Sequence, residues 1–218
     1  MLAVRTSRGS ERSHMRYSKE HKVKAKQAIL SSAARALKRD GFNGIGVDGL
    51  AASAQVTSGG FYSSFATKEA LLAEVIGAEL GAMFSGLADA DADADPAGRG
   101  RRLAELIAVY LSDEHCQDAA DGCVMPSLSA DVARAGAGVR ETYRLRMTEL
   151  VATLALAMDG TAEEREQRAW AAVATIVGAV TVARALPPGP EAGAVLDAAF
   201  ATVMQTAGIR DGRRRAES

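Results

Sequence analysis

Residues 45–68 read IGVDGLAASAQVTSGGFYSSFATK, and this stretch decides the fold. Apolar residues recur within it three and four positions apart, which predicts one short helix over residues 47–54 and another over residues 58–64. A tight turn, Gln55-Val56-Thr57-Ser58, joins the two, and Thr57 is a good N-cap for the second helix. Two short helices joined by such a turn indicate a helix-turn-helix.

The exposed positions of the second short helix carry small or hydrogen-bonding residues, as a helix needs when it enters the major groove of DNA, about 12 Å wide. Phosphate groups are bound by backbone N–H groups at helix starts, by hydroxyls and by lysines. The turn and its neighbouring helices offer all three kinds of donor. The candidate DNA-binding residues are Lys22, Gly46, Thr57, Ser58, Gly60, Tyr62, Ser63, Ser64, Thr67 and Lys68.

Longer helices are predicted on both sides of this motif. A basic helix covers residues 22–40 and stops at a glycine, and a fourth helix runs from residue 68 to about residue 87. Phe61 and Phe65 lie four positions apart and should face the core. Because both phenylalanines then point inward, Tyr62 is expected to be exposed.

Charge is divided unevenly along the chain, although the formal net charge is −1. Residues 1–68 hold 12 Lys and Arg residues against 4 Asp and Glu, whereas residues 69–218 hold 14 against 23. This asymmetry indicates a basic module for a polyanion, joined to an acidic body with another task. A solvated basic face without a partner is the alternative interpretation.

Four motifs carry a resemblance to a known family: GF at residues 41–42, VDGLA at 47–51, VTSGGFYSSF at 56–65 and TKEAL at 67–71. Together they resemble the N-terminal domain of TetR-family transcriptional regulators, over about residues 22–80. The resemblance implies an all-helical homodimer with a variable ligand-binding C-terminal domain. Such proteins usually repress transcription and leave the operator when a small molecule binds.

Several positions depart from the family's pattern. Gly46 stands where a Thr commonly caps the first short helix, and Gln55 stands where the turn often holds Gly. Ser58 replaces a common Lys or Arg, and Ser63 and Ser64 replace larger residues. Direct base contacts are therefore expected to be sparse, so the N-terminal lysines should supply more of the affinity and DNA shape some of the specificity.

The rest of the chain is predicted to be a second helical domain. Residues 89–95 alternate Asp with Ala and form a solvated connector. Residues 171–183 are apolar on nearly all sides, which indicates contact with another subunit. We expect a homodimer through the last two long helices, about residues 161–186 and 190–207. Helical periodicity predicts helices over residues 101–111, 125–134, 139–158, 161–186 and 190–207.

These elements predict an all-α fold, in which an N-terminal three-helix helix-turn-helix DNA-binding domain precedes a helical ligand-binding and dimerisation domain. The first domain covers residues 21–81 and the second covers residues 82–208. We expect a flexible basic arm over residues 1–20 and a disordered tail over residues 209–218.

A small-molecule site in the second domain should be mostly apolar with a few polar anchors. We therefore expect a largely apolar effector. Methionines and aromatic residues at helical spacing are the candidates, although core packing is the alternative for each. The candidate ligand-binding residues are Met83, Phe84, Leu106, Tyr110, Met125, Leu128, Tyr143, Met147, Trp170 and Thr175.

The sequence gives little support for an enzyme, a metal-binding protein, a disulfide-rich protein or a membrane protein. The chain has three histidines and no HExxH, CxxC or Gly-rich phosphate loop, so we expect no enzymatic activity, no cofactor and no metal site. Cys116 and Cys123 are too few for a disulfide framework, and redox sensing by either thiol stays open. No apolar run approaches the ~20 residues of a membrane span, and we expect a cytoplasmic protein.

Two functions remain. The leading hypothesis is a DNA-binding transcriptional regulator, specifically a repressor that a small molecule releases from a near-palindromic double-stranded operator. The alternative is a helical small-molecule-binding protein with weak or vestigial DNA binding, which Gly46 and the serines at 58, 63 and 64 favour. An activator or architectural role would use the same DNA-binding domain.

Overall fold

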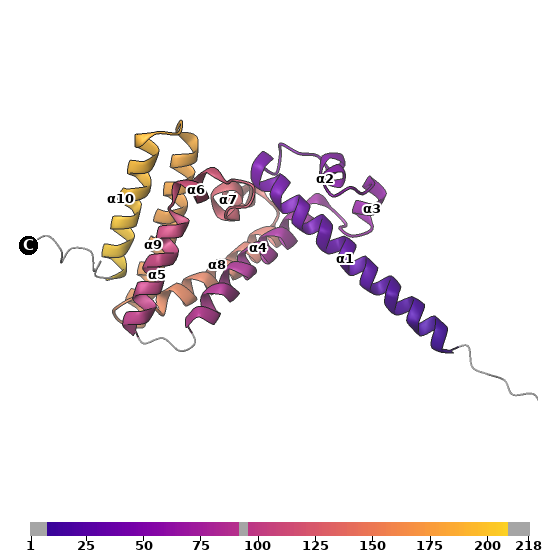
Figure 1. Ribbon diagram of the computed structural model, residues 1–218, viewed down its shortest axis with the longest axis horizontal. Helices are drawn as coiled ribbons and strands as arrows, with labels where there is room; N and C mark the ends of the chain where they lie inside the picture. Colours follow the sequence, from indigo (N-terminus) through magenta and orange to yellow (C-terminus); the bar gives the residue numbers. More distant parts are fainter. Residues whose placement is uncertain (1–7, 92–95, 209–218) are drawn as a thin grey trace, which may run out of the picture.

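The computed structural model describes residues 8–91 and 96–208, with side chains from residue 23 to 82 and from 98 to 208. Over these ranges the chain forms ten helices and no strand (Figure 1). The predicted all-α fold is thus confirmed. Residues 92–95 of the predicted connector and the tail from residue 209 lie outside the described residues.

The N-terminal domain, called the head below, consists of α1 (Arg8–Asp40), α2 (Val47–Ser53), α3 (Ser58–Tyr62) and the start of α4 (Lys68–Asp91). Phe61 and Phe65 are 0% and 2% exposed, as predicted, and their rings lie against each other in the core with centroids 5.7 Å apart. The first helix begins at Arg8 rather than near Lys22. Residues 8–20, which we expected in a flexible arm, therefore continue α1.

The second domain, called the body below, contains the rest of α4 and six further helices. α9 and α10 lie side by side at the end of the molecule away from the head, and α4 packs along α8 (Figure 1). The short helix α6 was not predicted, because its five residues are too few to show a helical period. The bounds are α5 (Pro96–Tyr110), α6 (Asp113–Gln117), α7 (Val124–Arg134), α8 (Ala137–Ala155), α9 (Ala162–Ala185) and α10 (Pro190–Ala207).

Side-chain caps fix several helix starts. The Thr57 hydroxyl accepts a hydrogen bond from Gly60 N at 3.1 Å, and Thr67 does the same for Ala70 N at 3.0 Å. Thr161 and Glu164 form the reciprocal capping box that starts α9. Each cap satisfies a backbone donor that has no partner within its helix.

One face of α9 is apolar but exposed. In the described part of the chain, α9 is the one helix long and apolar enough to span a membrane by length and composition, yet only 39% of its apolar window is buried. Trp170 is 42% exposed and Val182 is 50% exposed. We call this exposed face the α9 stripe: Gln167, Trp170, Ala171, Ala174, Gly178, Thr181, Val182 and Ala185.

Candidate DNA interface and ligand pocket

The turn between α2 and α3 is closed by backbone hydrogen bonds. Val56 N donates to Ala51 O at 3.0 Å, and Gln55 adopts the left-handed conformation with φ of 57°. A residue with a Cβ is strained by roughly 1–2 kcal/mol in that region, which explains why a glycine suits this position better than glutamine. The Val56 side chain is half-buried against the core.

The outer face of α3 is exposed and carries little bulk. Thr57, Gly59, Tyr62 and Ser63 are exposed, and the Tyr62 side chain is 55% exposed, as predicted. The Tyr62 ring meets the buried Phe61 ring edge-on at 5.5 Å between centroids. This perpendicular contact holds the Tyr62 ring beside the core, although much of the residue stays in solvent.

The serine hydroxyls of this surface donate their hydrogens within the head. Ser58 Oγ donates to Asp48 Oδ1 at 2.6 Å, and Ser63 Oγ donates to Gly60 O at 2.7 Å. Ser64 Oγ is 3.5 Å from the same carbonyl. These oxygens can still accept hydrogen bonds but have no second proton to donate. Base readout through serine donors is accordingly restricted.

The glycines of α3 are not required by packing inside the head. A methyl group added at Gly59 would meet only Thr57 Oγ1 at 3.8 Å, and one added at Gly60 would make ordinary contacts at 3.5 Å. Glycine within a helix costs about 0.5–1 kcal/mol relative to alanine. Packing inside the head does not require a glycine at position 59. We therefore expect this glycine to allow the close approach of another molecule to α3.

Lys68 is held inside the head rather than standing free at the start of α4. Its ammonium donates to Phe42 O and lies 4.2 Å from the centroid of the Phe42 ring. Burial lowers the pKa of Lys68, and the nearby Asp131 carboxylate opposes that shift. A phosphate contact through Lys68 would have to share the ammonium with these partners.

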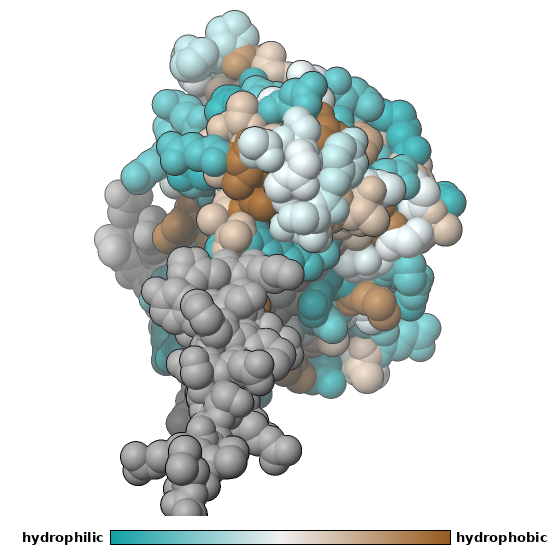
Figure 2. Space-filling view, turned by 90° about the vertical axis from the view of Figure 1, so that its right-hand side faces the viewer, coloured by the Kyte–Doolittle hydropathy of each residue, from teal (hydrophilic) through white to brown (hydrophobic). Residues whose placement is uncertain are grey.

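The other candidates of the head differ in what they offer. Gly46 is the N-cap of α2 and provides no side-chain cap, with space around it for one. Lys24 is exposed on α1, whereas Lys26 pairs with Glu74 at 2.7 Å. The side chain of Lys22 lies outside the described residues. Seen from this end of the molecule, the described surface is largely hydrophilic or neutral with small apolar patches (Figure 2).

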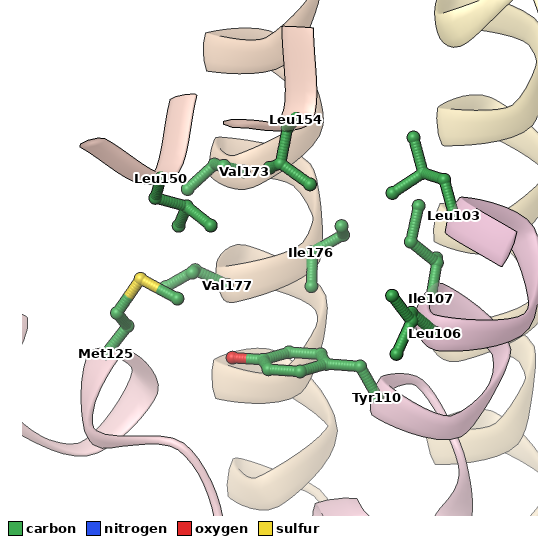
Figure 3. A pocket seen from close by; sticks show the side chains of 10 residues that line it. All are labelled: Leu103, Leu106, Ile107, Tyr110, Met125, Leu150, Leu154, Val173, Ile176 and Val177. Atoms are coloured by element: carbon green, nitrogen blue, oxygen red, sulfur yellow. The ribbon is translucent and has the colours of Figure 1, made fainter. Parts of the chain in front are cut away.

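The body contains an apolar pocket of about 70 Å³. Four helices contribute to it, and the side chains converge on a common space (Figure 3). This volume is smaller than the ~300–1,000 Å³ of typical small-molecule sites, so a ligand of that size would require the pocket walls to move apart. The lining residues are Leu103, Leu106, Ile107 and Tyr110 of α5, Met125 of α7, Leu150 and Leu154 of α8, and Val173, Ile176 and Val177 of α9.

Three of the predicted ligand-binding residues line this pocket, namely Leu106, Tyr110 and Met125. The others do not. Met83 and Phe84 lie outside the described side chains, Leu128 and Met147 are buried in the core, and Trp170 is exposed on α9. The Tyr143 hydroxyl bonds Ser129 Oγ at 2.7 Å, and the Thr175 hydroxyl donates to Ala171 O at 2.8 Å; neither residue lines the pocket. The aliphatic lining residues of α8 were missed because helical periodicity does not tell which buried leucine borders a cavity.

Polar groups gather behind one wall of the pocket. The Tyr110 and His115 rings stack with centroids 4.5 Å apart, and the Cys123 thiol faces the Tyr110 hydroxyl. Burial raises the pKa of Tyr110, Cys116 and Cys123 and lowers the pKa of His115. All four groups are therefore uncharged at neutral pH. Protonated thiols are poor nucleophiles, which weighs against redox sensing.

The head and the body are tied together around the loop that precedes α7. Lys38 is the one charged residue that is buried in the described structure, and its ammonium donates to Glu79 Oε2 at 2.7 Å and to Gly122 O at 3.0 Å. Gly122 has no room for a Cβ, which would come within 2.4 Å of Asp118 O and 2.8 Å of Arg184 Nη2. The loop is thus closely confined.

Two further bonds run from α7 and its C-terminal end to the head. Phe42 N donates to Asp131 Oδ2 at 3.0 Å, and Gly136 N donates to Glu69 Oε1 at 3.3 Å. Since Met125 at the other end of α7 lines the pocket, this helix connects the pocket wall with the turn between α1 and α2. No cluster of metal-ligating side chains occurs among the described residues.

Comparison with known proteins agrees with this architecture. Residues 29–75 match the family model described as bacterial regulatory proteins, tetR family. The chain is similar to the reduced form of NemR from E. coli, with a TM-score of 0.68 at 20% identity, covering 84% of this chain and 96% of NemR. None of the curated proteins matches it.

Two further solved structures have the same fold. A TetR-family regulator from Agrobacterium tumefaciens has a TM-score of 0.67 at 18% identity, covering 83% of this chain and 98% of the other. FadR from Bacillus subtilis, solved in complex with stearoyl-CoA, has a TM-score of 0.61 at 14% identity, covering 85% of this chain and 99% of FadR.

The fold and the head define a helix-turn-helix DNA-binding regulator. Residues 29–75 match the tetR family model, so the head is a TetR-type helix-turn-helix domain, and over most of the chain the fold is that of solved TetR-family structures. The resemblance found in the sequence is thereby confirmed.

Replacing Gly59 with alanine should separate folding from DNA binding. We expect G59A to be as stable as the parent or more stable by up to about 1 kcal/mol, because alanine favours a helix over glycine. Binding to duplex DNA selected from a randomised library should weaken about tenfold, because the methyl group lies where α3 approaches the duplex. Urea unfolding and fluorescence anisotropy measure the two effects.

The matched control is Gly138→Ala, at the corresponding position of α8, where a methyl group meets nothing within 4 Å. It should change stability in the same direction and leave DNA affinity unchanged. Equal DNA affinity for G59A and the parent would remove α3 from the proposed interface.

Proposed function

We propose that this protein is a homodimeric repressor that binds a near-palindromic duplex operator and leaves it when a largely apolar small molecule occupies the pocket of the body. One observation carries the proposal: α7 borders the apolar pocket and also bonds the head, which presents the small, exposed, hydroxyl-bearing α3. Members of this family are generally transcription factors without enzymatic activity, so we propose no reaction, and we expect the protein to act in the cytoplasm.

The α9 stripe supports pairing of two chains. Its residues are mostly small, so two copies of α9, together with α10, could pack closely as a four-helix interface. The exposed apolar area of this helix would then be buried against the partner. Two copies of α3 would face successive major grooves if they lay about 34–36 Å apart.

A route from the pocket to the head runs through α7. A ligand that displaces Met125 would shift the N-terminal end of this helix, next to the Gly122 carbonyl that Lys38 holds. The Asp131 carboxylate would carry the shift to Phe42 N in the head. The distance between the two heads would then no longer match the spacing of the two half-sites of the operator. The ligand can cause this change only to the extent that it binds the DNA-free conformation more tightly than the DNA-bound one.

An operator-selection experiment tests the proposal directly. A duplex enriched from a random library should contain two related half-sites, and its complex should survive excess random DNA. The alternative, a small-molecule-binding protein with vestigial DNA binding, draws support from the internal bonds of Ser58, Ser63 and Lys68. Loss of all retardation under competition would favour that alternative, and a reporter assay would separate repression from activation.

Dimerisation can be tested with Ala174→Glu. Because Ala174 is exposed in the centre of the α9 stripe, a carboxylate there should leave each chain folded but place two buried charges in the proposed interface. We expect monomers in sedimentation experiments and a loss of about a hundredfold or more in operator affinity, because the two heads are no longer linked.

Leu145→Glu is the matched control, since Leu145 is 49% exposed on α8, outside the stripe. It should remain dimeric and bind DNA normally. A dimeric A174E protein would exclude this face as the interface.

The connection between α7 and the head can be tested with Asp131→Ala. Phe42 N would lose its acceptor, so the free energy of unfolding should fall by about 1–3 kcal/mol. Operator affinity should fall too, because loosely held heads sample separations that miss the two grooves. Urea unfolding and anisotropy check these outcomes.

Arg134→Ala serves as the control, because Arg134 pairs with the same carboxylate at 3.0 Å but its side chain is 65% exposed. A change within about 0.5 kcal/mol is expected there. Unchanged operator affinity in D131A would show that this bond does not position the head.

A further inference from the structure

A hydrogen bond between two side chains joins α2 to α3 at the surface of the head. Ser58, the first residue of α3, donates from Oγ to Asp48 Oδ1 of α2 at 2.6 Å. The two short helices lie side by side (Figure 1). Asp48 is exposed and Ser58 is half-buried, so a molecule that approaches the N-terminal end of α3 would meet this pair.

The direction of this bond follows from the chemistry of the two groups. A carboxylate can only accept, whereas a serine hydroxyl has one proton to donate and two lone pairs with which to accept. Because Asp48 takes the single proton of Ser58, the Ser58 oxygen is left as an acceptor. Ser63, at the other end of α3, is oriented in the same way, since its Oγ donates to the Gly60 carbonyl at 2.7 Å.

Asp48 is an unfavourable residue for a surface that only has to bind the DNA backbone. Among the side chains that the structure describes, Asp48 belongs to no ion pair. Its negative charge therefore repels phosphate groups, which lowers the affinity for every duplex alike. The gain from this carboxylate must lie in something other than backbone affinity, and its hydrogen bond to Ser58 offers that gain.

Donors suited to phosphate lie elsewhere on the same surface. The Thr57 hydroxyl accepts from Gly60 N at 3.1 Å and thus keeps its own proton for another acceptor. The Tyr62 side chain is 55% exposed. Phosphate oxygens only accept, so these hydroxyls can bind the DNA backbone, whereas the oxygens of Asp48 and Ser58 cannot. The acceptors at this end of α3 therefore require a donor on the duplex, and the base edges of the major groove provide it.

Only two bases offer such a donor in the major groove. Adenine presents its N6 amino group and cytosine its N4 amino group, whereas guanine and thymine present acceptors alone. An acceptor-only hydroxyl pairs with either amino group, but it faces another acceptor when it meets guanine O6 or thymine O4. The second arrangement leaves two acceptors without a partner in the interface, which disfavours binding.

We propose that Ser58 accepts a hydrogen bond from the amino group of an adenine or a cytosine in each half-site of the operator, and that Asp48 sets this preference by holding the Ser58 proton. Asp48 is thus a positioning residue that acts through Ser58. The inference rests on the proposed function in taking α3 as the helix that enters the major groove. It adds the class of base that is read and the residue that determines the specificity.

The test starts from the operator that the full-length protein selects from a random library. Each position of both half-sites is replaced in turn by the other three base pairs, and the affinities are measured by fluorescence anisotropy. At one position of each half-site we expect adenine and cytosine on the same strand to bind within about threefold of each other. Guanine and thymine there should bind roughly tenfold more weakly or more, as expected for one unfavourable base contact.

Three variants test the roles of the two residues. In Asp48→Ala the Ser58 hydroxyl is free to donate as well as to accept, so the four bases at this position should bind within about threefold of one another. Ser58→Ala should lose the preference because the oxygen that reads the base is absent. The double variant D48A/S58A should show the same base preference as S58A, because Asp48 then has no hydroxyl to orient. Since the bond is exposed, all three variants should stay folded, which circular dichroism checks.

Asp40→Ala is the matched control for charge, because Asp40 is an exposed carboxylate of the head that pairs with Arg39 at 2.7 Å. This variant should change the affinity for all duplexes by one common factor and leave the base preference intact. A D48A protein that behaves in the same way would mean that Asp48 acts through its charge alone, and the proposal would fail.

Two further results would overturn the proposal: a base preference that survives in S58A, or a selected operator in which no position separates adenine and cytosine from guanine and thymine. In either case the duplex is still bound through two half-sites, so the proposed function stands. Absence of any sequence-selective binding would instead refute the proposed function, and this inference with it. Release of the operator by a small molecule plays no part in these measurements.

Discussion

The contact between Lys38 and the Gly122 carbonyl is the constraint on which the arrangement of the two domains depends. An ammonium buried this deeply is stable only when it is paired, and here it has both the Glu79 carboxylate and the Gly122 carbonyl. The three groups come from α1, α4 and the loop before α7. Removing any one of them would leave a buried polar group without its partner, so head, body and loop must keep their positions together.

The sequence predicts the helices of this protein well where local rules determine them. The caps at Thr57 and Thr161 and the last helix, Pro190–Ala207, follow from residue types at fixed spacings. The pocket could be predicted only in part, because its lining depends on how four helices pack against one another. Leu106, Tyr110 and Met125 line it, whereas Trp170, chosen by the same criterion, faces solvent. Helical spacing alone does not distinguish these cases.

The candidate DNA-binding surface could likewise be predicted only in part. Exposure of Tyr62 and burial of Phe61 follow from the four-residue spacing of the phenylalanines. The hydrogen-bond partners of the polar side chains do not follow from this spacing, because a hydroxyl or an ammonium bonds whichever neighbour the fold brings close. Ser58 bonds Asp48 ten residues away, and Lys68 bonds the Phe42 carbonyl of a distant turn. The sequence identifies the donor groups, but it does not identify the acceptors that they bond in the fold.

Gly122 is confined on two sides, by the Asp118 carbonyl and by the Arg184 guanidinium. Any larger residue there would push apart the short helix α6 and the long helix α9, and would carry the Lys38 acceptor away with them. Natural variation at this position should therefore be rare among proteins that share the junction, even where the pocket walls have diverged to suit other molecules. A glycine that contacts neither nucleic acid nor effector would then be among the slowest-changing positions of the chain.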